Sequence, residues 1–280
     1  MNIVQMHERV RFWTDTVGSP RWEAEDIDTA LNTSQNDIVE EKYMATRIIS
    51  KGDSFQKTQK IRDELSNLVN IKNFTGGEIA NSVTTIMGSV TNTCVVAAAG
   101  YPANYRYQLA LSVNVGSPTA TRYNCIPTTY DRINVIKDNP FRRLRTSIFP
   151  KVYYIESTTG LSIYHLLSST VSSSDLYYLA APVQYRYGTE YDSAQHFTSF
   201  DIVIVVSATV VYKGTTYYRG NEITITAGNE HITSGTVLFN FTDSNINETL
   251  HEQIARKAAV NLLLSVKEFD KSKEVTAYFI

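Results

Sequence analysis

The residues that could do chemistry are few and widely spaced. The five histidines of the chain are His7, His165, His196, His231 and His251. A metal site on a helix or in a loop needs two such ligands a few residues apart, and no pair of these histidines has that spacing. His251 opens a predicted helix, where a role at the helix surface is expected. The histidines therefore predict no metal site.

Motifs for nucleotide binding and for nucleophilic catalysis are missing from the sequence as well. Gly214 and Gly220 lie close together but lack the Lys-Ser/Thr ending of a phosphate-binding loop, and hairpin turns account for both. The sequence contains no Gly-x-Ser-x-Gly elbow, and no His-containing motif surrounds Cys94 or Cys125. We therefore predict that the protein is not an enzyme and uses no cofactor. A hydrolase whose site is assembled from distant residues stays open as an alternative.

Composition argues against several other classes. The formal net charge of −2 supplies no global basic field that would attract nucleic acid or an anionic membrane. No run of apolar residues approaches the length of a membrane-spanning helix, and the first residues lack the pattern of a secretory signal. In a chain without an export signal, we expect Cys94 and Cys125 to be reduced core thiols.

One basic cluster stands out at residues 141–145, with the sequence FRRLR. Its cations are Arg142, Arg143 and Arg145. A solvated face or a contact with an acidic partner is the favoured interpretation, because the chain lacks the repeated basic and aromatic pattern of a nucleic-acid binder. A local patch lining a DNA conduit is the alternative, since phosphate contacts need only a few cations.

Both ends of the chain are predicted to be helical. An apolar stripe at alternating three- and four-residue steps marks a first helix; its members are Ile3, Met6, Val10, Trp13 and Val17. After a Gly-Ser-Pro break, a second helix is expected over 23–46, about 35 Å long. Its inward side includes Ile27, Leu31 and Ile38, and Trp22 precedes it. A third helix is expected over 53–70, and a last one opens at Thr249 and Glu252, which have capping-box spacing.

The middle of the chain is predicted to be strands and turns. The 18 tyrosines and the many Thr and Ser residues favour β structure. Strands are expected at 92–99, 105–115, 120–126, 151–156, 161–167, 202–212, 215–219, 222–226 and 236–241. A short helix is expected at 129–138, and a tight hairpin followed by a second turn at 210–226.

This order of elements predicts an α+β fold. Helices at the two ends form a helical core, and the large central antiparallel β-rich region is sandwich- or barrel-like. Four segments are expected: a helical hairpin with the third helix (1–75), a β-rich region with a short helix (76–187), a β-rich insertion (188–246), and a C-terminal helix with a tail (247–280). The last helix is expected to pack on the first ones.

Several segments together resemble one family of viral proteins. RVRFWTDTVGSPRWEAEDIDTALNTSQNDIVEEKY, with its Ser19–Trp22 turn and Ile27–Asn32 helix, is similar to the N-terminal hairpin of head-to-tail connector proteins of tailed bacteriophages, especially crAss-like podoviruses. YPANYRYQLALSV (101–113), Asn-Pro-Phe (139–141), KVYYIESTTGLSIYHL, YLAAP (178–182) and NETLHEQIARKAAVNLLL follow in similar order. The chain departs from this pattern at about 188–245.

The resemblance implies a structural virion protein. It would be made in the host bacterial cytoplasm and would form a neck or tail adaptor ring, commonly about twelve copies around a DNA channel. Its partners would be further copies of itself, the portal protein and neighbouring tail proteins, with genomic DNA passing through and no membrane involved. The helices would form the adaptor core, and no catalytic residue is implied.

The apolar stripe allows the same interpretation on physical grounds. A helical hairpin with few helical neighbours of its own is suited to pack against adjacent copies. We therefore expect the assembly interface at Ile3, Met6, Val10, Trp13, Val17, Trp22, Ile27, Leu31 and Ile38. The alternative function is a receptor- or glycan-binding tail appendage that uses the Tyr-rich β region.

Overall fold

The chain forms two compact units. The computed structural model describes residues 1–16, 21–49, 62–86, 89–116, 121–138, 151–158, 160–165, 170–191, 196–197, 202–225, 230–231, 236–239, 241–266 and 275–276. Unit 1 comprises Met1–Leu68 and Pro182–Ile280, and unit 2 comprises Val69–Ala181. Unit 2 is therefore inserted between the two halves of unit 1.

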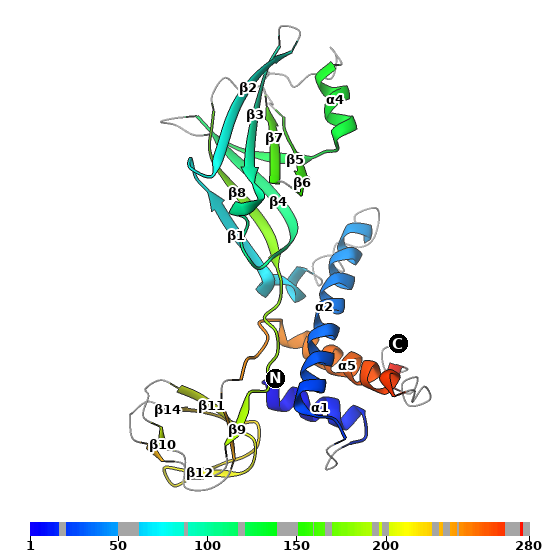
Figure 1. Cartoon of the computed structure of the whole chain (residues 1–280), viewed down its shortest axis with the longest axis vertical. Coiled ribbons are helices and arrows are strands. Elements are labelled where there is room, and N and C mark those ends of the chain that lie inside the picture. The colour runs from blue at the N-terminus through cyan, green and yellow to red at the C-terminus, as the bar shows by residue number, and fades with distance from the viewer. Residues whose placement is uncertain are drawn as a thin grey trace. The chain divides into compact units, whose positions relative to one another are not determined.

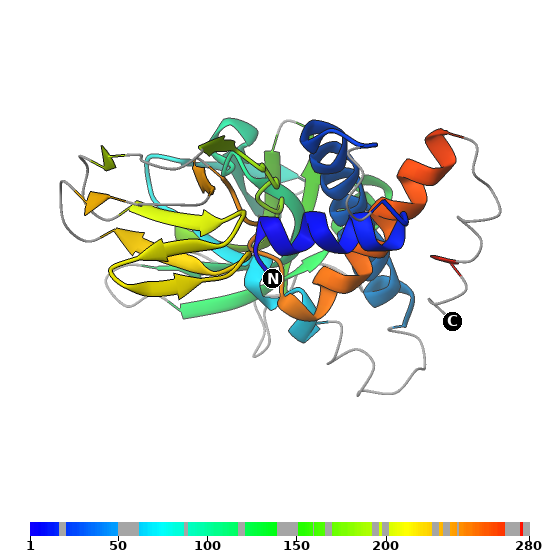
Figure 2. The same cartoon turned by 90° about the horizontal axis from the view of Figure 1, so that it is seen from below.

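The helices of unit 1 come from both halves of the chain. They are α1 (Ile3–Trp13), α2 (Ala24–Ile49) and α5 (His251–Ser265), with the 3-10 turns η1 (Ser66–Leu68) and η3 (Glu248–Leu250). Helix α5 contacts both α1 and α2, and α1 and α5 cross each other (Figure 2). Their facing side chains are buried; they include Ile3, Met6, Val10, Ile27, Leu31, Ile38, Ile254, Ala258 and Leu262. The ends of the chain therefore share one core.

The strands of unit 1 form a small antiparallel sheet in the order β14-β11-β16-β9. Its members are β9 (Thr189–Tyr191), β11 (Ile202–Val206), β14 (Glu222–Ile225) and β16 (Val237–Phe239). Beside it, β10 (His196–Phe197) pairs with β15 (Glu230–His231), and β12 (Val210–Tyr212) with β13 (Thr215–Tyr217). The expected tight hairpin is confirmed: Lys213 and Gly214 have φ of 49° and 77°, the two positive values of a type I′ turn.

Unit 2 is built on one eight-stranded sheet in the order β1-β8-β4-β5-β6-β7-β3-β2, curled into a half-barrel (Figure 1). Its elements are β1 (Val69–Phe74), β2 (Ile79–Ile86), β3 (Ser89–Ala97), η2 (Ala98–Gly100), β4 (Tyr105–Val115), β5 (Thr121–Pro127), α4 (Tyr130–Asp138), β6 (Val152–Ser157), β7 (Gly160–His165) and β8 (Val171–Ala180). All neighbouring strands are antiparallel except β5 and β6, which α4 separates in sequence. A parallel pair needs such a crossover.

The curled sheet encloses its own core. Seven of its eight strands contribute buried apolar side chains to this core, and β5 adds the half-buried Tyr123 and Cys125; the buried ones include Phe74, Ile79, Cys94, Val113, Tyr154, Leu161 and Leu176. The two ends of the sheet approach each other where the amide of Asn81 on β2 bonds to both backbone groups of Val171 on β8. The Asn81 side chain thus makes the pair of hydrogen bonds that a backbone residue of a paired strand would make. It joins β2 to a strand that is not its neighbour in the sheet.

The α+β class and the barrel-like curvature agree with the sequence expectation, but several boundaries differ. Unit 2 spans 69–181 rather than 76–187, and residues 188–246 belong to the same compact unit as the helices. The third helix was expected to reach residue 70, but β1 already begins at Val69; residues 50–61 lie outside the described part. Strands β1, β2 and β8 of unit 2 were not predicted, and neither were the short strands β9, β10 and β15 of unit 1.

Candidate functional site

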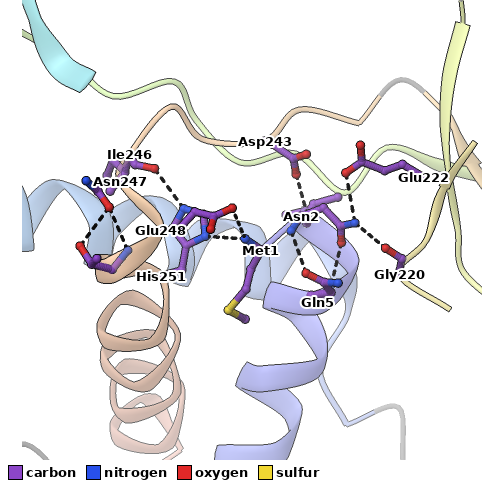
Figure 3. A network of polar contacts seen from close by, with 12 residues as sticks. Met1, Asn2, Gln5, Gly220, Glu222, Asp243, Ile246, Asn247, Glu248 and His251 are labelled. Atoms are coloured by element: carbon purple, nitrogen blue, oxygen red, sulfur yellow. Dashed lines mark hydrogen bonds and ion pairs between the residues drawn. The ribbon is translucent and has the colours of Figure 1, made fainter. Parts of the chain in front are cut away.

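The start of α1 joins two distant parts of unit 1. Asn2 caps the helix by accepting from the Gln5 N–H, while its amide nitrogen donates to the Gly220 carbonyl at 2.7 Å and to Glu222 at 3.3 Å (Figure 3). The Ile3 N–H donates to Asp243 at 2.6 Å. Gly220 has a φ of 83°, and a Cβ there would lie 3.1 Å from the Gln5 side chain. Glycine therefore allows this turn to lie close against α1.

Two titratable groups in this network have shifted pKa values. Burial is the main cause that raises the pKa of Asp243, and Glu222 raises it further, while the Ile3 N–H acts in the opposite direction. Burial likewise lowers the pKa of His251, whose Nε2 lies 3.2 Å from the Ile246 carbonyl. Neutral His251 with its proton on Nε2 donates to that carbonyl and leaves Nδ1 as an acceptor for the terminal ammonium 3.0 Å away.

A second buried group lies one turn further along α1. His7 is fully buried; its Nε2 lies 2.8 Å from Asp28 on α2, and its ring stacks on Tyr187 at 4.4 Å. The other oxygen of Asp28 accepts from the Tyr187 backbone N–H. Burial lowers the pKa of His7, and Arg11 and Arg219 lower it too, whereas Asp28 raises it. His7 is therefore neutral at pH 7. It connects α1 with α2 and with the segment that contains Tyr187, just before β9.

Two open grooves flank Arg11 and Arg219. The Phe12 groove, about 530 Å³, is lined by Met1, Gln5, Glu8, Arg9, Arg11, Phe12 and Arg219. The Ser207 groove, about 450 Å³, is lined by Arg11, Ala24, Tyr187, Gly188, Ser207, Ala208, Arg219 and Thr236. The first is bordered by an exposed aromatic side chain, and the second by polar groups. These two recesses are the candidate functional site of unit 1.

The expected assembly stripe is wrong in its placement. Ile3, Met6, Val10, Ile27 and Leu31 are all fully buried within a single chain, and so is nearly all of Ile38. Side chains that are already enclosed by α1, α2 and α5 have no surface left for a second copy. The periodicity correctly marked a buried face, but the last helix of the same chain covers it. Val17 lies outside the described residues.

The two tryptophans are half-buried and have partners within the chain. Trp13 donates its indole N–H to Glu252 at 3.0 Å, and the Arg256 guanidinium lies 4.5 Å from its ring. The Arg21 guanidinium lies 5.5 Å from the Trp22 ring. Both indoles therefore take part in the fold of one chain.

The remaining sequence candidates fall elsewhere. Arg142, Arg143 and Arg145 lie outside the described residues, so the basic patch stays a prediction. Cys94 and Cys125 are free thiols, as expected, and both pack in the core of unit 2. Burial raises the pKa of each to about 12, and the nearby Cys94 contributes to the shift at Cys125.

The sequence did not identify the residues that line the two grooves as candidates for a functional site. Arg11 and Arg219 are far apart in the chain, and each occurs in an ordinary context, a helix surface and a hairpin turn. Ser207 follows an apolar strand with no motif around it. Only the fold brings these three together, and no spacing in the sequence signals it.

The described part of the chain contains no group of three His, Cys, Asp or Glu side chains arranged to hold a metal ion. None of its helices combines the length and the apolar character needed to cross a membrane. No protein-family model matches the chain, and no curated protein sequence matches it.

Proposed function

We propose that this protein is a structural virion protein, a subunit of the head-to-tail connector ring of a tailed bacteriophage. The segments that resemble such connectors support this proposal, because the helical ones pack together as α1, α2 and α5. In this proposal, copies of the chain form a closed ring between portal and tail, around the path of the DNA. Head-to-tail contacts close into rings when the rotation per copy divides a full turn.

The observation that carries the proposal is the solvent-facing side of α1. Phe12 is 55% exposed, and the Arg9 guanidinium lies 5.9 Å from its ring. The Phe12 groove opens beside them. Aromatic and arginine side chains are enriched in protein interfaces and at their energetic centres, and a neighbouring recess can receive an anchor from a partner. Helix α1 is thus proposed as an assembly element through the face opposite to the stripe.

The test is the oligomeric state of the purified protein, alone and with a portal protein. Native mass spectrometry and negative-stain images are expected to show discrete rings. Phe12→Asp is expected to abolish ring formation while the circular dichroism spectrum stays unchanged, since the side chain is exposed. Val135→Asp on α4, where Val135 is 53% exposed, is the matched control and is expected to assemble normally.

Two outcomes would count against the ring. A wild-type protein that stays monomeric at high concentration with portal supplied contradicts the proposal, and so does ring formation by Phe12→Asp. Trimers that bind glycans through the Tyr-rich β region would favour a tail appendage instead.

A further inference from the structure

The Ser207 groove has the composition of a site for an oxyanion. Arg11 projects from α1, and Arg219 comes from the turn after β13. Both also border the Phe12 groove, and both act electrostatically on buried His7, so the two guanidinium groups lie near one another. Two cations on a shared recess favour a negatively charged ligand.

The two arginines differ in how far they are already neutralised. Arg219 forms an ion pair through Nε with Glu8 at 2.8 Å, which leaves its terminal nitrogens for other partners. Arg11 has no carboxylate within ion-pair distance among the described residues. Asp28, the nearby acid on α2, already accepts from the Tyr187 N–H and contacts His7. Among the described residues, the Arg11 guanidinium therefore has no ion-pair partner and can bind an anion.

Ser207 supplies the second, independent observation. The residue is only 6% exposed, and its hydroxyl has no hydrogen-bond partner in the described part of the chain. Its backbone N–H, in contrast, donates to the Thr236 carbonyl. A buried hydroxyl without a partner is unfavourable, so such groups are rare unless something else satisfies them. A ligand oxygen in the groove would do so.

We propose that the Ser207 groove binds a phosphate group, either free or at the end of a small molecule. Guanidinium groups recognise phosphate through paired N–H donors, and a hydroxyl donates to a further oxygen of the same group. The volume of about 450 Å³ accommodates a small phosphomonoester. Duplex DNA is disfavoured as the ligand. Its phosphates are part of a continuous backbone, which cannot enter the recess far enough to reach the buried Ser207 hydroxyl. This site does not depend on the ring proposal.

The test is the titration of the full-length protein with inorganic phosphate and with phenyl phosphate, followed by calorimetry at constant ionic strength. Saturable binding is expected for both, each displacing the other. Arg11→Gln is expected to weaken binding about tenfold or more, and Ser207→Ala about three- to tenfold. Glu8→Gln, which frees Arg219, is expected to strengthen binding. Arg132→Gln, an exposed arginine on α4, is the control and is expected to leave affinity unchanged.

The absence of saturable binding overturns the proposal, and so does an Arg11→Gln protein that binds as the wild type does. Should Arg11→Gln fail to fold, the opposite effects expected for Ser207→Ala and Glu8→Gln decide the question, because a purely structural role predicts no gain in affinity. Duplex DNA that competes as well as phenyl phosphate would overturn the assignment to a terminal phosphate. Rings that form normally without phosphate binding would leave the proposed connector function intact.

Discussion

At the scale of single residues, Glu252 connects two helices that come from opposite ends of the chain. One carboxylate oxygen accepts from the Trp13 indole and lies 3.1 Å from Arg256, and the other lies 3.3 Å from Arg9. Arg256 also covers the face of the Trp13 ring. A half-buried carboxylate with three donors holds α1 against α5 through both charge and hydrogen bonds.

The bond between Trp13 and Glu252 can be measured by a double-mutant cycle. Trp13→Phe removes the indole N–H but keeps an aromatic ring, and it is expected to lower the free energy of unfolding by about 1–2 kcal/mol. Glu252→Gln is expected to cost a similar amount. In the double mutant the two losses are expected to overlap by about 1 kcal/mol, measured by urea denaturation. Strictly additive losses would show that the two side chains do not interact.

At the scale of elements, Asn81 links β2 to β8, two strands that are not neighbours in the curled sheet. Its two bonds to Val171 replace a strand pairing, and Val171 itself is buried. Asn81→Ala is therefore expected to leave the backbone groups of Val171 without these partners and to lower the free energy of unfolding by about 2–3 kcal/mol. Faster hydrogen exchange at the Val171 amide would report the same opening.

A neighbouring asparagine provides the control for this prediction. Asn73 on β1 also bonds across strands, to Asp175, but this contact is exposed. Asn73→Ala is expected to cost less than about 1 kcal/mol, because water replaces the lost partner. Equal losses for the two variants would mean that the link between β2 and β8 through Asn81 adds nothing to stability.

The elements differ in how well their sequences reveal them. Strand β4 has the bounds expected for it, 105–115, because alternating apolar residues run between clear turns. Strand β1, VNIKNF, was missed because Leu65 and Leu68 continue a helical spacing into it. Strand β8 was missed because it begins with Val-Ser-Ser-Ser-Asp, whose polar side chains resemble a loop. In both cases pairing with distant strands outweighs the local pattern.

Periodicity also left open which partner covers a buried face. The stripe on α1 was read correctly as apolar and helical, yet the covering element is α5, more than two hundred residues later. Amphipathic spacing records that a face is buried but not by what. The grooves beside Arg11 and Arg219 pose the same problem, since their residues meet only after folding.

At the scale of the whole molecule, buried histidines are expected to make stability depend on pH. Burial lowers the pKa of His165 to about 4 and lowers those of His7 and His251. The unfolded chain then binds more protons than the folded one between pH 6.5 and about 4, so stability is lost as pH falls through that window. The raised pKa of Asp243 has the opposite effect on stability at the acidic end of the pH range, because there the folded chain binds the additional proton.

His165 alone is expected to contribute about 3 kcal/mol to this loss by pH 4. The measurement is urea denaturation at a series of pH values for the wild type and for His165→Gln. The variant is expected to show a shallower slope below pH 6.5, whatever its absolute stability. Parallel slopes for the two proteins would contradict the assignment.

The division into two units gives a further prediction for the whole chain. Unit 2 is continuous in sequence, has its own core and contains all eight strands of its sheet. A fragment of residues 69–181 is therefore expected to fold alone and to melt cooperatively, as followed by circular dichroism. A fragment of residues 1–68 lacks α5 and is expected to stay largely unfolded. A fragment 69–181 without a cooperative transition would argue that unit 2 depends on its surroundings.

The insertion of unit 2 also sets an order of events on the ribosome. Strands β1 to β8 emerge as one uninterrupted stretch and can mature while later codons are still being read. The apolar faces of helices α1 and α2 stay uncovered until α5 is translated, and α5 begins some seventy residues after unit 2 ends. Nascent chains of this protein are thus expected to recruit a chaperone at their leading end, and that need disappears only when α5 has left the exit tunnel.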